Sequence, residues 1–254
     1  MHPRPPSASR RPHPQALVAI GLILLAVYAL RHTLSTTTLL VFAVIVPSII
    51  LHEVSHGVVA LACGDDTARR AGRLTLNPLR HVDPVGTLVL PAVLALSGLG
   101  AFGYAKPVPV NPARMRSPRN GSLVTSLAGP AVNAALAGLS IVVLRVVRPP
   151  GTVAALSAAL SFGGLGAVDL VDRVIFLLGF LNVTLMVFNL IPLPPLDGSA
   201  VVERLLPASA WPAWLQVRRY AMPVLLVLVL VDGGRVLSHV FGPAERAWVH
   251  LLTG

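Results

Sequence analysis

The sequence predicts an all-α polytopic membrane protein. Of its 254 residues, 54% are hydrophobic and only 12% are charged, and the mean hydropathy is +0.76. These values lie outside the usual range for water-soluble domains. Many apolar residues fall in runs of about 20, the length that a helix needs to cross a bilayer. We expect five to six transmembrane helices, a re-entrant segment, and short β-strands or extended loops near the cytoplasmic face.

The N-terminal segment differs in composition from the rest. Residues 1–14 are rich in Pro, Ser, Arg and His and lack the apolar core and cleavage site of a signal peptide. They are predicted to form a disordered cytoplasmic tail. Residues 15–254 are expected to form a single integral membrane domain.

Long apolar runs predict where the spans lie. A further run, 85–105, contains Pro91 and ends in the sequence SGLGAFG. It is predicted to be re-entrant if the arginine-rich loops on both sides of it are cytoplasmic, and a sixth span is the alternative. The five clearer spans are expected at about residues 15–34, 39–63, 122–147, 174–196 and 220–241.

The basic residues predict the orientation in the membrane. The chain has 20 Lys and Arg against 10 Asp and Glu, a net charge of +10. These cations lie in short loops, which is typical of the positive-inside rule and not of a nucleic-acid surface. The loops 64–84, 106–120 and 197–219 and the N-terminus are therefore predicted to be cytoplasmic. The arginine-rich, Ala- and Gly-rich composition favours a bacterial protein of the plasma membrane.

Two histidines and a glutamate lie inside the second apolar run, in LHEVSHGVVA. Ionisable side chains in hydrocarbon are costly unless they are paired, ligated or hydrated. His52 and His56 are four positions apart, so both imidazoles share a helical face and can bind one zinc ion. Glu53 lies about 100° round the helix, where its carboxylate can act as a general base on water. The pattern H-E-x-x-H thus predicts one catalytic Zn²⁺ per chain.

A catalytic zinc ion of this kind needs a third protein ligand. Elimination among the ten acidic residues leaves Asp83, Asp197 and Asp232. Asp197 is favoured because it ends the sequence NLIPLPPLDG, whose prolines unwind the helix and can turn the carboxylate towards the protein interior. Asp83 and Asp232 remain as alternatives.

Four motifs can be read together: HEVSHG at 52–57, AKPVPVNP at 105–112, AGPAVN at 128–133 and FNLIPLPPLDG at 188–198. They resemble the site-2 protease family of intramembrane zinc metalloproteases, and most of all its short bacterial branch without PDZ or CBS domains. The resemblance implies that His52, His56 and Asp197 bind zinc and that Glu53 is the catalytic base. It places the metalloprotease core at about 39–205.

Two asparagines are candidates for stabilising an oxyanion. By the resemblance, Asn189 would lie near the metal and the substrate, with a hydrogen bond between helices as the alternative. Asn133 is the second candidate, although Gly129 and Pro130 beside it favour a structural role in close helix packing.

The segment KPVPVNP is predicted to be an extended strand with one open edge. Pro107 and Pro109 lack N–H groups, whereas Val108 and Val110 keep theirs on the other edge. A helical substrate must become extended before cleavage, and such a strand can bind it by β-augmentation. RLTLN at 73–77 is a candidate partner strand. A rigid extended loop is the alternative.

These features predict an intramembrane zinc endopeptidase that hydrolyses peptide bonds within or near transmembrane segments, as in regulated intramembrane proteolysis. A divalent-metal-ion transporter is the alternative, because intramembrane His and Asp also line ion pathways. The expected partners are membrane-embedded protein substrates and the lipid bilayer, without nucleic acid. A homo-oligomer or a regulatory membrane partner is left open.

Overall fold

The structure is a computed structural model that describes residues 35–83, 106–162, 164–232 and 235–254. The expected tail at 1–14, the span at 15–34 and the re-entrant segment at 85–105 lie outside these residues. The chain divides into two compact units, 1–39 and 40–254. In the first, Ser35 Oγ accepts a hydrogen bond from the Thr38 N–H at 3.1 Å, which caps the start of a helix.

All regular secondary structure in the described residues is helical. Short single-turn helices link the longer ones: η1 (Pro78–Arg80), η3 (Pro112–Arg114), the π-helical η4 (Val143–Val147), η5 (Leu165–Ala167) and η6 (Ala208–Ala210). The α-helices are α2 (Thr36–Ala62), α3 (Thr67–Arg70), α5 (Pro118–Val142), α6 (Thr152–Phe162), α7 (Leu170–Leu190), α8 (Ser199–Leu205), α9 (Trp211–Asp232) and α10 (Arg235–Thr253).

Three of the described helices are long and apolar enough to cross a membrane. They are α2, α5 extended through η4 (Pro118–Val147), and α7. They match the runs predicted at 39–63, 122–147 and 174–196, so a polytopic membrane fold fits the structure. The run predicted as a single span at 220–241 is instead divided, because α9 ends at Asp232 and α10 begins at Arg235.

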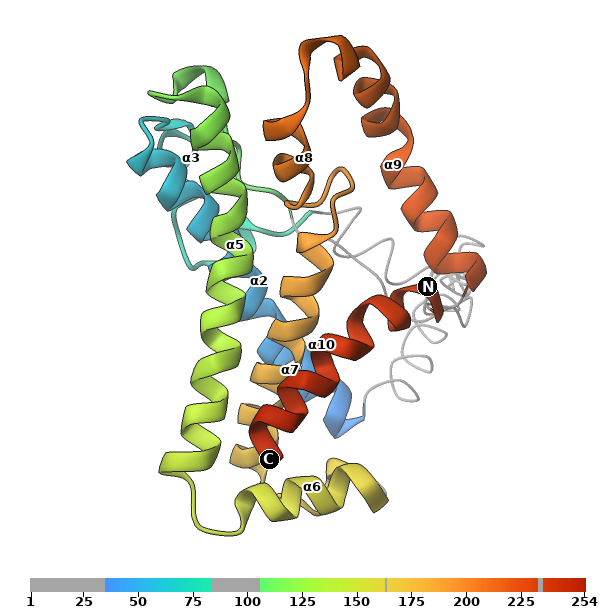
Figure 1. The fold of residues 1–254 in the computed structure, drawn as a ribbon. Helices are drawn as coiled ribbons and strands as arrows, with labels where there is room; N and C mark the ends of the chain where they lie inside the picture. The colour runs from blue at the N-terminus through green and yellow to red at the C-terminus, as the bar shows by residue number, and fades with distance from the viewer. Residues whose placement is uncertain (1–34, 84–105, 163, 233–234) are drawn as a thin grey trace, which may run out of the picture. The chain divides into compact units, whose positions relative to one another are not determined.

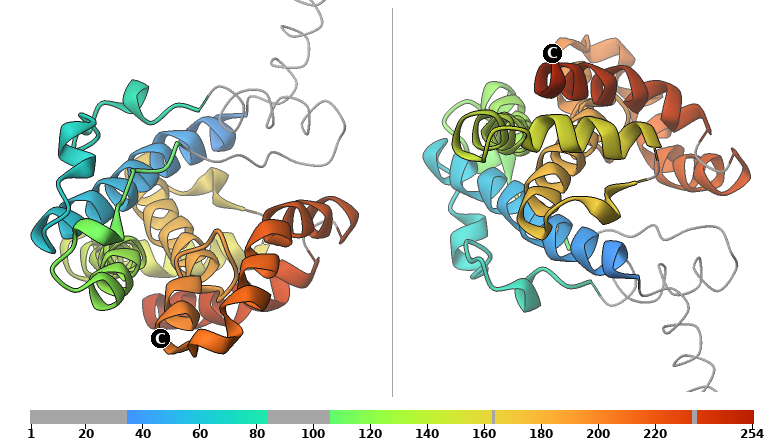
Figure 2. Two further views of the ribbon diagram at one scale, coloured as in Figure 1. Left: turned by 90° about the horizontal axis from the view of Figure 1, so that it is seen from above. Right: turned by 90° about the horizontal axis from the view of Figure 1, so that it is seen from below.

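The packing of the second unit centres on α5 and α7, which lie side by side (Figure 1). Helix α10 packs against α7, and α6 lies across one end of the bundle (Figure 2). Trp248 of α10 is buried in this core and donates its Nε1–H to the Ala137 carbonyl at 3.1 Å. A Cβ at Gly179 would lie 2.1 Å from the indole ring, so glycine at this position lets the ring reach α7.

The α6 end of the bundle is held by ion pairs. Asp169 caps α7 by accepting the Val171 N–H at 3.0 Å. Arg148, just after η4, pairs with both Asp169 and Asp172. These two aspartates therefore join the end of η4 to the start of α7.

The predicted strands are absent from the described residues. The segment 106–111 and the stretch 73–77 have no strand pairing. The Lys106 N–H instead donates to the His81 carbonyl at 2.9 Å. Arg73 donates to the Lys106 carbonyl at 2.5 Å. The rigid extended loop, which was the alternative expectation, describes this segment, because proline at alternate positions removes the N–H groups that a ladder needs.

Candidate metal centre

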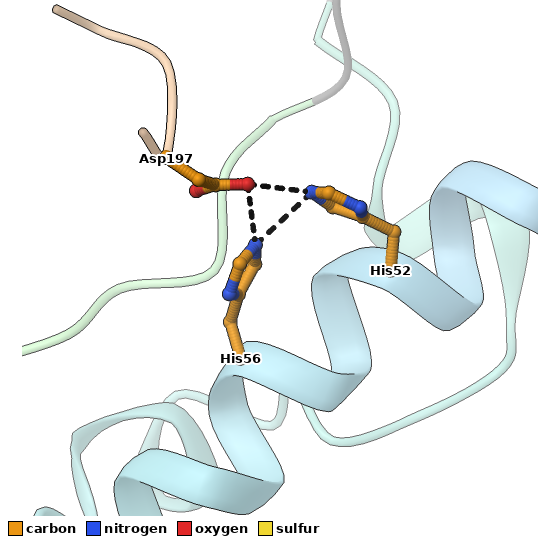
Figure 3. Close-up of side chains that lie close together, drawn as sticks. All are labelled: His52, His56 and Asp197. Carbon is orange, nitrogen blue, oxygen red and sulfur yellow. Dashed lines mark hydrogen bonds and ion pairs between the residues drawn. The ribbon is translucent and has the colours of Figure 1, made fainter. Parts of the chain in front are cut away.

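Three potential ligand atoms converge between α2 and the loop before α8 (Figure 3). The Nε2 atoms of His52 and His56 lie 3.1 Å apart. Asp197 Oδ2 lies 3.1 Å from the first and 3.3 Å from the second. In a tetrahedral zinc site with bonds of about 2.0–2.1 Å, neighbouring ligand atoms are about 3.3–3.4 Å apart. The three separations are thus close to those of one face of a tetrahedral site.

Both imidazoles project from one face of α2 and are buried, with exposed fractions of 6% and 8%. Gly129 of α5 lies directly against them. A Cβ at this position would be 2.5 Å from His52 Nε2 and 2.6 Å from His56 Nε2. Helix α5 can therefore pass this close to the two ligand atoms only because residue 129 has no side chain.

Asp197 is brought to the histidines by a tight return of the chain. Helix α7 ends at Leu190, two residues before Pro192, because proline lacks an N–H and restricts the residue before it. The Gly198 N–H then donates to the Asn189 carbonyl at 2.6 Å, so the loop folds back onto the end of α7. A Cβ at Gly198 would lie 2.2 Å from the Leu190 carbonyl oxygen, which requires glycine here.

The atoms that converge in this site offer lone pairs and negative charge, which suit a bound cation. His56 Nδ1 lies 2.7 Å from the Thr125 carbonyl, which can only accept, so Nδ1 carries the proton and Nε2 of the neutral ring presents a lone pair. Asp197 Oδ2 is buried and receives no hydrogen bond within the described part of the chain. A lone pair and a carboxylate oxygen this close favour a positive ion between them, and two nitrogens and one oxygen are a ligand set that Zn²⁺ accepts.

Of the two alternative third ligands, Asp83 can be compared with this group. Among the described residues, the cluster of metal-binding side chains contains His52, His56 and Asp197, and Asp83 is not part of it. The side chain of Asp232 lies outside what the structure describes.

Comparison with known proteins identifies the family. The sequence model of peptidase family M50 matches residues 39–232. This chain belongs to that family. The Bacillus subtilis (strain 168) protein "Putative zinc metalloprotease YwhC" is 37% identical over 218 residues, which cover 86% of this chain and 90% of that protein. No solved structure matches the chain.

Two mycobacterial proteins, each named "Putative zinc metalloprotease Rip2", are also similar. The protein of Mycolicibacterium smegmatis is 33% identical over 195 residues, 76% of this chain and 67% of that protein. The protein of Mycobacterium tuberculosis (strain H37Rv) is 36% identical over 184 residues, 72% of this chain and 63% of that protein. The resemblance to site-2 proteases is confirmed, and the chain is a metallopeptidase.

In this M50 peptidase, Glu53 is held by the backbone of the extended loop. The Val108 N–H donates to Glu53 Oε2 at 2.8 Å, and the Val108 side chain is buried. The expectation that this N–H is open to a substrate is therefore not met, because Glu53 already accepts it. Val110 is half-buried, and its N–H has no hydrogen-bond partner among the described residues.

The two asparagine candidates have different surroundings. Asn133 is fully buried, and its Oδ1 lies 2.5 Å from His52 Nδ1, the nitrogen on the far side of the ring from the ligand atom. This contact supports the structural interpretation of Asn133 over the oxyanion role. Asn189 donates its amide to the Leu185 carbonyl of its own helix at 2.9 Å and makes no hydrogen bond to the three ligand residues.

Several neighbours of the M50 site are absent from the sequence-based prediction. The Thr125 carbonyl belongs to the backbone, so no side-chain pattern could reveal it. Ser48 and Asn182 are buried polar residues inside apolar helices, and that signal could have identified them, because buried polar groups need partners.

Proposed function

We propose that this protein is an intramembrane zinc endopeptidase that hydrolyses peptide bonds within or next to transmembrane segments of other membrane proteins. One observation carries the proposal: two of the three converging ligand residues lie on α2, a helix apolar enough to span a bilayer. A peptidase site placed in a span acts on segments that enter the membrane. Membership of a peptidase family favours this function over metal transport.

We assign the metal to His52, His56 and Asp197, and the role of general base to Glu53. A zinc ion bound there supplies Lewis acidity, which polarises a peptide carbonyl and acidifies a water molecule. The Val108 N–H orients the Glu53 carboxylate through Oε2. Oε1 is then left to take the proton of the attacking water and to pass it to the leaving amine.

The distribution of charge supports an orientation with the metal centre nearer the cytoplasm. Helices α3 and α8 and the start of α5 lie at one end of the bundle, and α6 lies at the other (Figure 1). The elements at the first end carry arginines, among them Arg69 and Arg70 of α3, Arg119 of α5 and Arg204 of α8, and cations next to a span stay inside. With Cys63 replaced, an impermeant thiol reagent should label a cysteine at Pro150 in intact cells. Equal labelling of a cysteine at Arg70 would contradict this orientation.

The remaining expectations form part of the same proposal. We place a single membrane domain at 15–254, behind a cytoplasmic tail at 1–14, in a bacterial plasma membrane. The named relatives are bacterial. Its partners would be the lipid bilayer and membrane-embedded protein substrates.

The decisive experiment compares the wild type with Glu53→Gln. Each is co-expressed with a panel of single-span membrane proteins, and accumulated fragments are identified by mass spectrometry. We expect cleavage inside or near the spans by the wild type only, with zinc retained at one ion per chain in both. Fragments that are identical in the two strains would refute the assignment of Glu53. Metal uptake into proteoliposomes without any proteolysis would refute the endopeptidase.

A further inference from the structure

We propose that Asn133 and Asn182 are positioning residues, which hold His52 in the tautomer and orientation that bind zinc. The inference rests on the proposed function and deepens it. It gives a role to two side chains that are not among the three ligand residues, one in α5 and one in α7.

A chain of buried hydrogen bonds runs through these side chains. Asn133 Oδ1 lies 2.5 Å from His52 Nδ1. Asn133 Nδ2 donates to Asn182 Oδ1 at 2.6 Å. Asn182 Nδ2 donates to Ser48 Oγ at 2.9 Å and to the Leu178 carbonyl at 2.7 Å. Both asparagines are 0% exposed, and Ser48 lies one turn before His52 on α2, so the chain starts and ends on the same helical face.

A backbone carbonyl decides the direction of every bond in this chain. The Leu178 carbonyl can only accept, so the amide nitrogen of Asn182 must face it, and Oδ1 must face Asn133. Asn133 therefore has to donate through Nδ2, which turns its Oδ1 towards His52. His52 Nδ1 must then carry the proton.

The consequence for His52 is a lone pair on the ligand atom. A neutral imidazole with its proton on Nδ1 presents an unprotonated Nε2, which here faces His56 Nε2 and Asp197 Oδ2. If the Asn133 amide were reversed, its NH₂ group would face Nδ1, and the proton would move to Nε2, where it would block metal binding. The amide orientation thus selects the metal-binding tautomer.

The comparison with His56 explains why two asparagines are needed. His56 donates its Nδ1–H directly to a backbone carbonyl, that of Thr125. His52 has a side chain as its Nδ1 partner, and an amide can turn over, whereas a carbonyl in a helix cannot. Asn182 removes that freedom by linking Asn133 to the Leu178 carbonyl. The Leu178 carbonyl therefore fixes the His52 proton on Nδ1 through two side chains, as the Thr125 carbonyl does directly for His56.

The first test removes the remote member of the chain. Asn182→Leu keeps the number and branching of the side-chain heavy atoms but leaves Asn133 without an orienting acceptor. We expect the zinc dissociation constant of the purified full-length protein to rise about tenfold or more, and the visible spectrum of the cobalt-substituted protein to change. Ser140→Ala is the matched control, since Ser140 is equally buried but bonds only to the Ala137 carbonyl of its own helix. It should bind zinc as the wild type does.

The second test separates positioning from stability. Asn133→Asp still offers an oxygen to the His52 Nδ1–H, whereas Asn133→Leu offers nothing. Burying a carboxylate costs more than burying a leucine, so the aspartate variant should unfold at the lower temperature without metal. Zinc affinity should follow the reverse order, with the aspartate variant binding more tightly. If Asn133 had a purely structural role, the variant that unfolds at the lower temperature would also bind zinc more weakly.

These outcomes are distinct from failure of the proposed function. A wild type without stoichiometric zinc would refute the zinc peptidase itself. A wild type that binds zinc and cleaves, beside an Asn182→Leu variant with unchanged affinity and cobalt spectrum, would overturn only the positioning role. Should that variant fail to accumulate, the two Asn133 variants decide the matter by the order of their affinities.

Discussion

Gly129 and the two imidazoles show how strongly single residues constrain this site. The ligand nitrogens of His52 and His56 occupy the space that a Cβ at position 129 would enter. Glu53 is constrained in another way, since its carboxylate accepts a backbone N–H from a segment 55 positions away in the sequence. Both constraints can be tested by substituting one residue.

Replacement of Gly129 by alanine should displace the zinc ligands. The added methyl group would lie within 2.6 Å of both ligand nitrogens, so the imidazoles must move. Misplacement by about 1 Å can lower turnover about 100-fold, and we expect zinc content to fall as well. Gly138→Ala is the control on the same helix, because no atom beyond its chain neighbours and its own helix backbone lies within 4 Å of the position of its Cβ. Full zinc occupancy and activity in Gly129→Ala would contradict this account.

Proline substitutions at Val108 and Val110 should affect different kinetic constants. Val108→Pro removes the N–H that orients Glu53, so kcat should fall, whereas Val108→Ala keeps the N–H and should lose less. Val110→Pro removes an N–H without a partner in the described structure, so KM should rise if an extended substrate binds there. The check is steady-state proteolysis in detergent. An unchanged KM in Val110→Pro would rule out substrate pairing at that edge.

At the scale of elements, the extended loop is held beside the site by the end of α2. Asp65 is 0% exposed and accepts hydrogen bonds from the Thr67 N–H at 3.0 Å and from the Asn111 N–H at 2.6 Å. It also accepts the Thr67 hydroxyl. Although burial acts to raise the pKa of Asp65, these hydrogen bonds hold it below its ordinary value. The helix end and the loop thus share one buried carboxylate.

Loss of this carboxylate should destabilise the protein and alter its response to acid. Asp65→Ala leaves the part-buried N–H groups of Thr67 and Asn111 without their acceptor, which costs about 1 kcal/mol or more. Asp66→Ala removes only exposed ion pairs and should cost less. Because the pKa of Asp65 is lower in the folded than in the unfolded state, its ionisation stabilises the wild type at pH values above the unfolded pKa of about 3.9. That stabilisation is lost as the pH falls through the folded pKa. Thermal unfolding measured between pH 3 and 7 checks both points. The unfolding temperature should depend less on pH in Asp65→Ala than in the wild type.

At the scale of the whole molecule, the metal centre joins segments that are distant in the sequence. The histidines lie on α2, and Asp197 follows α7. A zinc ion bound by all three would link these segments, and an ion that binds only the folded state stabilises it.

Zinc should therefore raise the unfolding temperature of metal-free protein. At a free concentration 100 times the dissociation constant, the gain is about 2.7 kcal/mol. Asp197→Ala should lose most of this gain, and Glu53→Gln should keep it, because Glu53 is assigned to water and not to the metal. Differential scanning of the purified protein with and without zinc measures the shift. An equal shift in Asp197→Ala would exclude Asp197 as a ligand.

The sequence alone determined the features that depend on local geometry. The spacing of His52 and His56 places them on one face of any helix, and the prolines before Asp197 end α7 wherever that helix packs. Three apolar helices likewise follow from the length of their runs. The division of the run at 220–241 was missed, although its Gly-Gly pair is a local signal.

Tertiary structure alone decided the contacts between helix faces. Asn133 meets His52 across 81 positions of sequence, and Asn182 meets Ser48 across 134. The Val108 N–H was expected to be free to bind a substrate, but it donates to Glu53 instead. Helical periodicity specifies which residues share a face, but the packing of side chains between helices specifies which faces meet. The three residues that converge were therefore readable in the sequence, whereas the contacts that orient them were not.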